Sequence, residues 1–86
     1  MTYRVKWSER SIKELEKLDR QVARTIFRFM NERVHGSANP SETGKAIQRE
    51  DLWRYRVGDY RVLCLIDDPV FIVLVVRLGH RREVYR

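Results

Sequence analysis

The second half of the chain contains three consecutive runs of strand-forming residues, separated by signals for tight turns. In order, these are residues 52–57, the Gly58-Asp59 turn, residues 60–67, a turn at Asp67-Asp68-Pro69, and residues 70–78. The last two runs are almost wholly apolar, which is typical of central strands. Runs this close together pair most readily with their neighbours, so we expect an antiparallel sheet.

The first half of the chain predicts one strand followed by two helices. Apolar and polar residues alternate over positions 2–7, as in a half-buried strand. Ser8 is placed to cap a helix that runs to about Leu18, and Asp19 to cap a second helix that stops near Gly36. The resulting order is β-α-α-β-β-β. We therefore expect an α+β fold in which two helices pack on one face of a small, antiparallel-rich sheet of about four strands.

Length and composition favour one domain over residues 1–86. The chain has 86 residues, of which 43% are hydrophobic, and its lone cysteine, Cys64, lies in an apolar run where a buried, inert thiol is expected. No signal peptide is visible, and the longest apolar run, residues 70–76, is too short to span a membrane. We therefore expect a soluble, cytoplasmic protein.

The charge balance favours a polyanionic partner. Lys and Arg number 18 against 12 acidic residues, a net charge of +6. If Gly58 and Asp59 are the central residues of the hairpin turn, Arg56 lies opposite Arg61, and Arg54 follows on the same face. Like charges opposed across a sheet are destabilising, whereas guanidinium groups bind phosphates well. The cluster indicates a phosphate site; a solvated basic face is the alternative.

The end of the chain adds further candidates. Strict alternation along the last strand puts positions 72, 74, 76, 78 and 80 on one side. If Val76 lies near Arg61, His80 then projects just beyond the arginines, where its near-neutral pKa suits proton transfer. Tyr85 either stacks on a base, donates a proton or packs the C-terminus. The sequence shows no metal-ligand spacing, Gly-rich phosphate loop or paired carboxylates, so we expect neither a metal nor a cofactor.

Three segments resemble the RelE/ParE superfamily of bacterial and archaeal toxins from toxin–antitoxin modules. Residues 3–18 resemble its opening strand and helix, residues 52–62 its basic hairpin, and residues 78–85 its Gly-His-Arg to Val-Tyr ending. The RelE branch is the most similar. This resemblance implies an endoribonuclease that cuts mRNA in the ribosomal A site, is neutralised by a RelB-like antitoxin, and binds operator DNA only together with that antitoxin.

The resemblance also implies site residues. Basic positions of the branch match Arg54, Arg56, Arg61 and Arg81, and its C-terminal tyrosine matches Tyr85. Where well-known members have two hairpin lysines this chain has arginines, which are poor bases, so we assign His80 in their place. Four other basic residues are assigned to RNA binding: Lys45, Arg49, Arg82 and Arg86.

Two other functions stay open. A ParE-like toxin that poisons DNA gyrase would share the fold but not the nuclease chemistry. A catalytically degenerate module would bind only its antitoxin or nucleic acid, and the replacement of the lysine pair is compatible with it.

Overall fold

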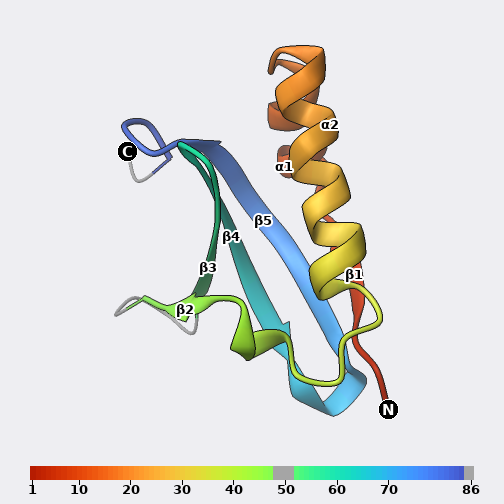
Figure 1. The fold of residues 1–86 in the computed structure, drawn as a ribbon. Helices are drawn as coiled ribbons and strands as arrows, with labels where there is room; N and C mark the ends of the chain where they lie inside the picture. The colour runs from red at the N-terminus through yellow and green to blue at the C-terminus, as the bar shows by residue number, and fades with distance from the viewer. Residues whose placement is uncertain (48–51, 85–86) are drawn as a thin grey trace.

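A computed structural model describes residues 1–47 and 52–84 of the chain (Figure 1). The regular elements are β1 (Arg4–Trp7), α1 (Glu9–Glu16), α2 (Arg20–Phe29), a π-helical turn (Met30–Val34), a 3-10 turn (Pro40–Glu42), β2 (Lys45–Ala46), β3 (Leu52–Val57), β4 (Tyr60–Asp67), a second 3-10 turn (Asp68–Val70) and β5 (Ile72–His80). The strands form one sheet in the order β1-β5-β4-β3-β2, in which β1 runs parallel to β5 and the other pairs are antiparallel. The predicted α+β class is confirmed, with the short β2 as a fifth strand.

Both predicted helix starts are confirmed. The Ser8 hydroxyl accepts a hydrogen bond from the Ser11 N–H at 3.1 Å, and the Asp19 carboxylate accepts one from the Gln21 N–H at 3.0 Å. Each bond satisfies an amide that the first helical turn leaves without a partner. The second helix widens into the π-helical turn and stops at Gly36, whose positive φ of 82° ends it as expected.

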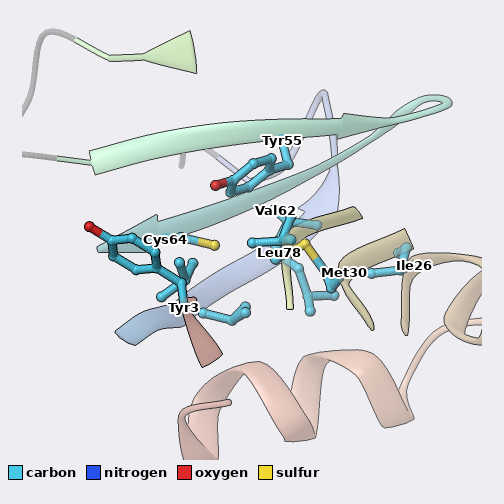
Figure 2. Close-up of a cluster of buried hydrophobic side chains, with 10 residues drawn as sticks. Tyr3, Ile26, Met30, Tyr55, Val62, Cys64 and Leu78 are labelled. Carbon is cyan, nitrogen blue, oxygen red and sulfur yellow. The ribbon is translucent and has the colours of Figure 1, made fainter. Parts of the chain in front are cut away.

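The core lies between α2 and one face of the sheet (Figure 2). Ile26, Met30 and Val34 are fully buried against side chains from β3, β4 and β5, among them Tyr55. The Tyr55 hydroxyl donates to the Pro40 carbonyl at 2.7 Å, which ties the loop before β2 to the sheet. Cys64 is buried as expected, and burial raises the pKa of its thiol.

The register of the basic hairpin is confirmed. Val57 lies opposite Tyr60 and Arg56 lies opposite Arg61, so Gly58 and Asp59 are the central turn residues. Gly58 has a φ of 60°, the left-handed value that a type II′ hairpin turn requires at this position.

The predicted alternation of the last strand is wrong, because a β-bulge shifts its register. The pairing steps from Leu63 opposite Arg77 to Cys64 opposite Val75, so Val76 is the additional residue. Gly79, rather than Val76, lies near Arg61. The bulge puts Leu78 on the core side together with Val73 and Val75, whereas strict alternation assigns Leu78 to the side of the arginines. The same shift moves His80 to the core side, opposite Tyr60.

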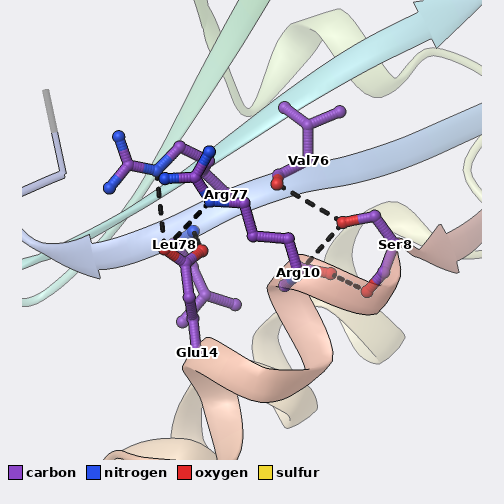
Figure 3. Close-up of polar contacts among 7 residues, drawn as sticks. Ser8, Arg10, Glu14, Val76, Arg77 and Leu78 are labelled. Atoms are coloured by element: carbon purple, nitrogen blue, oxygen red, sulfur yellow. Dashed lines mark hydrogen bonds and ion pairs between the residues drawn. The ribbon is translucent and has the colours of Figure 1, made fainter.

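Helix α1 closes the part of the β5 edge that β1 does not reach (Figure 3). β1 pairs with β5 only as far as Val75. Beyond it, the Ser8 hydroxyl donates to the Val76 carbonyl at 3.3 Å, and the Leu78 N–H donates to the Glu14 carboxylate at 2.9 Å. The polar side chains thus satisfy backbone groups that an edge strand would otherwise present to other chains.

Candidate nucleic-acid interface

The face of the sheet opposite the helices carries two rows of basic residues. Residues paired across neighbouring strands share a face, and the register therefore gives one row with Arg56 and Arg61 next to Gly79, and another with Lys45, Arg54 and Arg77 around Leu63. We call the five basic residues of these rows the arginine face: Lys45, Arg54, Arg56, Arg61 and Arg77. The structure thus brings the predicted Arg54, Arg56, Arg61 and Lys45 together.

The two opposed arginines have different surroundings. Arg56 is exposed, whereas Arg61 is only 8% exposed. The Nη1 of Arg61 donates to the carbonyls of Gly58 and Tyr60, each at 3.0 Å. Arg61 therefore braces the hairpin turn as well as adding charge to the face, while Arg56 presents its charge outward.

The C-terminal turn brings Arg81 to the same hairpin. The Arg81 N–H donates to the Asp59 carbonyl at 2.8 Å, so the chain after β5 is fastened to the hairpin turn. Val84 is buried over Gly79, where an added Cβ would lie 3.7 Å from the Val84 Cβ. Arg81 and Arg82 are exposed beside the turn. The predicted Tyr85, Arg86 and Arg49 lie outside the described residues.

His80 does not lie where the sequence placed it. Its ring makes an edge contact with Tyr60, with the ring centroids 5.5 Å apart, on the core side of the sheet rather than among the arginines. The His80 Nδ1 accepts a hydrogen bond from the Arg82 N–H at 3.2 Å. This bond holds the C-terminal turn, and it means that a neutral His80 carries its proton on Nε2.

Arg77 is the residue of the arginine face that was not predicted from the sequence. Strict alternation along β5 puts Arg77 on the same side as Val73 and Val75, which is the core side. The bulge at Val76 moves Arg77 to the other side of the sheet, the arginine face. Its Nε lies 3.5 Å from a carboxylate oxygen of Glu14 on α1, shown in Figure 3. A charge inside the apolar run 70–78 was the available signal, because an arginine there favours the uncovered face.

A cavity of about 430 Å³ lies beside the end of β5. Arg77, His80 and Tyr60 line it together with Lys17 of the α1 end and Glu83 of the C-terminal turn. It adjoins the arginine face through Arg77, and its lining combines cations, an aromatic ring and two carboxylates, those of Glu14 and Glu83.

Within residues 1–47 and 52–84, no group of three His, Cys, Asp or Glu side chains is arranged to hold a metal ion.

None of the helices in the described part of the chain is long and apolar enough to cross a membrane.

Comparison with known proteins finds toxins of toxin–antitoxin systems. Residues 5–85 match the family described as ParE toxin of type II toxin–antitoxin system, parDE. Toxin RelG of Mycobacterium tuberculosis is 31% identical over 88 residues, which cover 100% of this chain and 99% of RelG.

Solved structures agree with these matches. A chain of the toxin–antitoxin complex RelBE2 from M. tuberculosis is 29% identical, with a TM-score of 0.84 over 94% of this chain and 100% of that one. A chain of the archaeal RelE–RelB complex from Pyrococcus horikoshii OT3 is 28% identical, with a TM-score of 0.67 over 98% and 100%.

Proposed function

We propose that this toxin, which belongs to the ParE toxin family of type II toxin–antitoxin systems within the RelE/ParE superfamily, is a ribosome-dependent endoribonuclease. It acts in the cytoplasm, on mRNA in the ribosomal A site. The similarity to RelG and to the toxin chain of RelBE2 supports the RelE branch over the gyrase-directed branch.

The observation that carries the proposal is the arginine face. Arg56 and Arg61 are opposed across two strands, with Arg54 on the same face and Arg81 fastened beside the turn. Opposed like charges cost stability unless water or an anion compensates them. An RNA phosphate is the anion that such a cluster of forked donors suits best.

The chemistry proposed is attack of the RNA 2′-hydroxyl on the neighbouring phosphate. The O2′–P bond forms and the P–O5′ bond breaks, which leaves a 2′,3′-cyclic phosphate and a 5′-hydroxyl. Arg54, Arg56, Arg61 and Arg81 stabilise the negative charge that develops on the phosphate, the kind of contribution that is usually the largest in catalysis. The ribosome orients the message, so free RNA is a poor substrate.

Proton transfer is assigned to His80 and Tyr85. Because the His80 ring lies against Tyr60 on the core side of the sheet, its role requires the end of β5 and the C-terminal turn to rearrange toward the phosphate. A base needs a free lone pair, and the Nδ1 of His80 already accepts the Arg82 N–H. His80 can therefore take a proton only when this hydrogen bond opens, whereas its Nε2–H is available as a donor. Tyr85 is the second candidate group.

The partner proposed for this toxin is a RelB-like antitoxin. The structures similar to it include a RelBE2 complex and an archaeal RelE–RelB complex, in which the similar chains are bound to their antitoxins. An antitoxin that covers the arginine face would block access to RNA.

The test is to induce the toxin alone and to map mRNA 5′ ends on translated and untranslatable copies of one message. Cuts confined to the translated copy, and absent with Arg81→Ala, are expected. Cuts on both copies would remove the ribosome from the proposal. An Arg81→Ala toxin that cuts like the wild type, while still binding its antitoxin, would remove Arg81 from the site.

A ParE-like gyrase poison is the second candidate, and the family match favours it. Growth arrest with a DNA-damage response and intact messages would establish it. A folded protein that binds antitoxin without arresting growth would instead be a degenerate binding module.

A further inference from the structure

The arginine face does not end with the residues that resemble those of the RelE branch. Arg77 pairs across the sheet with Leu63, which in turn pairs with Arg54, so the face extends over three adjacent strands to β5. The Arg77 side chain is 24% exposed, which is less than expected for an arginine whose only contacts are with solvent at the surface.

Glu14 holds Arg77 from the side of the helix. One oxygen of this carboxylate accepts the Leu78 N–H at 2.9 Å, and the other lies 3.5 Å from the Arg77 Nε. The hydrogen bond to the backbone fixes the carboxylate, which is itself only 22% exposed. The contact to Arg77 uses the nitrogen nearest the side-chain stem. Such a fixed anchor lowers the rotamer entropy that an arginine loses when it binds a ligand.

Arg77 also borders the cavity of about 430 Å³ at the end of β5. Lys17 lines the same cavity, and so do the carboxylates of Glu14 and Glu83, so the charge that Arg77 adds to the arginine face lies at the border of a mixed-charge space. An RNA strand that crosses the face from β3 toward β5 meets Arg77 after the phosphate bound by the hairpin arginines.

We propose that Arg77, positioned by Glu14, binds a second RNA phosphate next to the one at the hairpin arginines. This inference rests on the proposed function, since it assumes RNA on the arginine face. It adds a contact on β5 and assigns Glu14 as its positioning residue.

The chain offers a matched control. Arg10 on α1 also forms an ion pair with Glu14, with its Nε 3.7 Å from the same oxygen, but its side chain is 64% exposed and lies on the helix, not on the arginine face. Arg10→Gln and Arg77→Gln each remove one positive charge and one partner of Glu14. They differ in whether the lost guanidinium faces the proposed RNA path.

The experiment measures binding of a short 2′-O-methyl single-stranded RNA, which cannot be cleaved, by fluorescence anisotropy over a range of salt concentrations. Log affinity decreases with log salt concentration, and Arg77→Gln is expected to make this negative slope shallower by about 0.7, the value for one phosphate contact to a single strand. Arg10→Gln is expected to keep the wild-type slope. A role of Arg77 confined to its ion pair with Glu14 would not change this slope.

Equal slopes and affinities for the Arg10→Gln and Arg77→Gln proteins would overturn the inference. If Arg77→Gln unfolds the protein, Arg77→Lys is the deciding variant. It is expected to keep the salt slope but to bind RNA several-fold more weakly than Arg10→Lys, and equal affinities of these two lysine variants would overturn the inference.

Arg56→Gln separates this result from the proposed function. A reduced slope with Arg56→Gln but not with Arg77→Gln rejects only Arg77, whereas wild-type binding without salt dependence rejects RNA on this face altogether.

Discussion

Arg56 and Arg61 are opposite each other in the hairpin, yet their side chains contribute differently to the fold. Arg61 is nearly buried and donates two hydrogen bonds to carbonyls of the turn, whereas Arg56 is exposed. Substituting each by glutamine therefore separates charge at the site from stability of the hairpin.

Arg56→Gln is expected to reduce mRNA cleavage at least tenfold while leaving stability unchanged or raising it by about 0.2–1 kcal/mol, because it relieves the opposed charges. Arg61→Gln is expected to reduce cleavage and also to lower the free energy of unfolding by about 1–3 kcal/mol, because two turn carbonyls lose a charged donor. Urea unfolding and ribosome-dependent cleavage measure the two effects. Equal losses of stability in the two variants would contradict the distinction.

His80 has a hydrogen bond that one substitution can preserve. In His80→Asn, the side-chain oxygen takes the place of Nδ1 and can still accept the Arg82 N–H. In His80→Gln, the polar group instead takes the place of Nε2. If His80 only holds the C-terminal turn, His80→Asn retains cleavage and His80→Gln loses part of it.

If His80 transfers a proton, both substitutions lower the cleavage rate by about 10²–10⁴-fold and change the pH dependence of that rate. We expect this second result on the proposed mechanism. Wild-type rates and pH profiles in both variants would leave Tyr85 as the remaining proton-transfer candidate.

At the scale of elements, helix α1 substitutes for a missing strand. β1 covers only the first part of the β5 edge, and side chains of Ser8 and Glu14 satisfy the backbone groups beyond it. The amphipathic pattern of α1 predicted a helix packed on the sheet, but not this edge contact, because the pattern does not show where β1 ends against β5.

Glu14→Ala is expected to lower the free energy of unfolding by about 1–3 kcal/mol, because the Leu78 N–H loses its acceptor. Glu14→Gln retains an acceptor oxygen and is expected to cost less. Amide hydrogen exchange reports the effect locally: exchange at Leu78 should accelerate in the alanine variant more than in the glutamine variant. Unchanged exchange at Leu78 in both would show that water replaces the carboxylate.

At the scale of the whole molecule, the core holds titratable groups in their neutral form. Burial raises the pKa of Cys64 and of Tyr55 above their ordinary values of 9.0 and 10.0. Above pH 9 the unfolded chain releases the thiol proton while the folded chain keeps it. Stability is therefore complete below that pH and is lost as pH rises.

The expected loss from Cys64 is about 1.4 kcal/mol per pH unit above pH 9. Urea unfolding between pH 8 and pH 10 measures it. Cys64→Ala removes the thiol, so its stability should be lower overall but should fall less steeply between pH 9 and pH 10, because Tyr55, with an ordinary pKa of 10.0, is only partly ionised there in the unfolded chain. An equally steep fall in the alanine variant would place the alkaline sensitivity elsewhere.

Local signals were sufficient for much of the fold. Ser8 and Asp19 could be recognised as caps because capping depends on a few neighbouring residues. The hairpin register followed from Gly58, since a two-residue turn determines every pair behind it. Arg54, Arg56 and Arg61 could therefore be grouped on one face from the sequence.

Only the tertiary structure decided what depends on the pairing of distant strands. The bulge at Val76 arises where β4 and β5 adjust their pairing, and no short-range pattern marks it, so the sequence put His80 near the arginines and missed Arg77. The contact between Glu14 and Arg77 likewise joins an early helix to the last strand. The sequence by itself determined which charges the hairpin presents, because these lie within one local turn. The extent of the arginine face was decided by the pairing of β4 with β5, because one added residue in a strand moves every residue beyond it to the other face of the sheet.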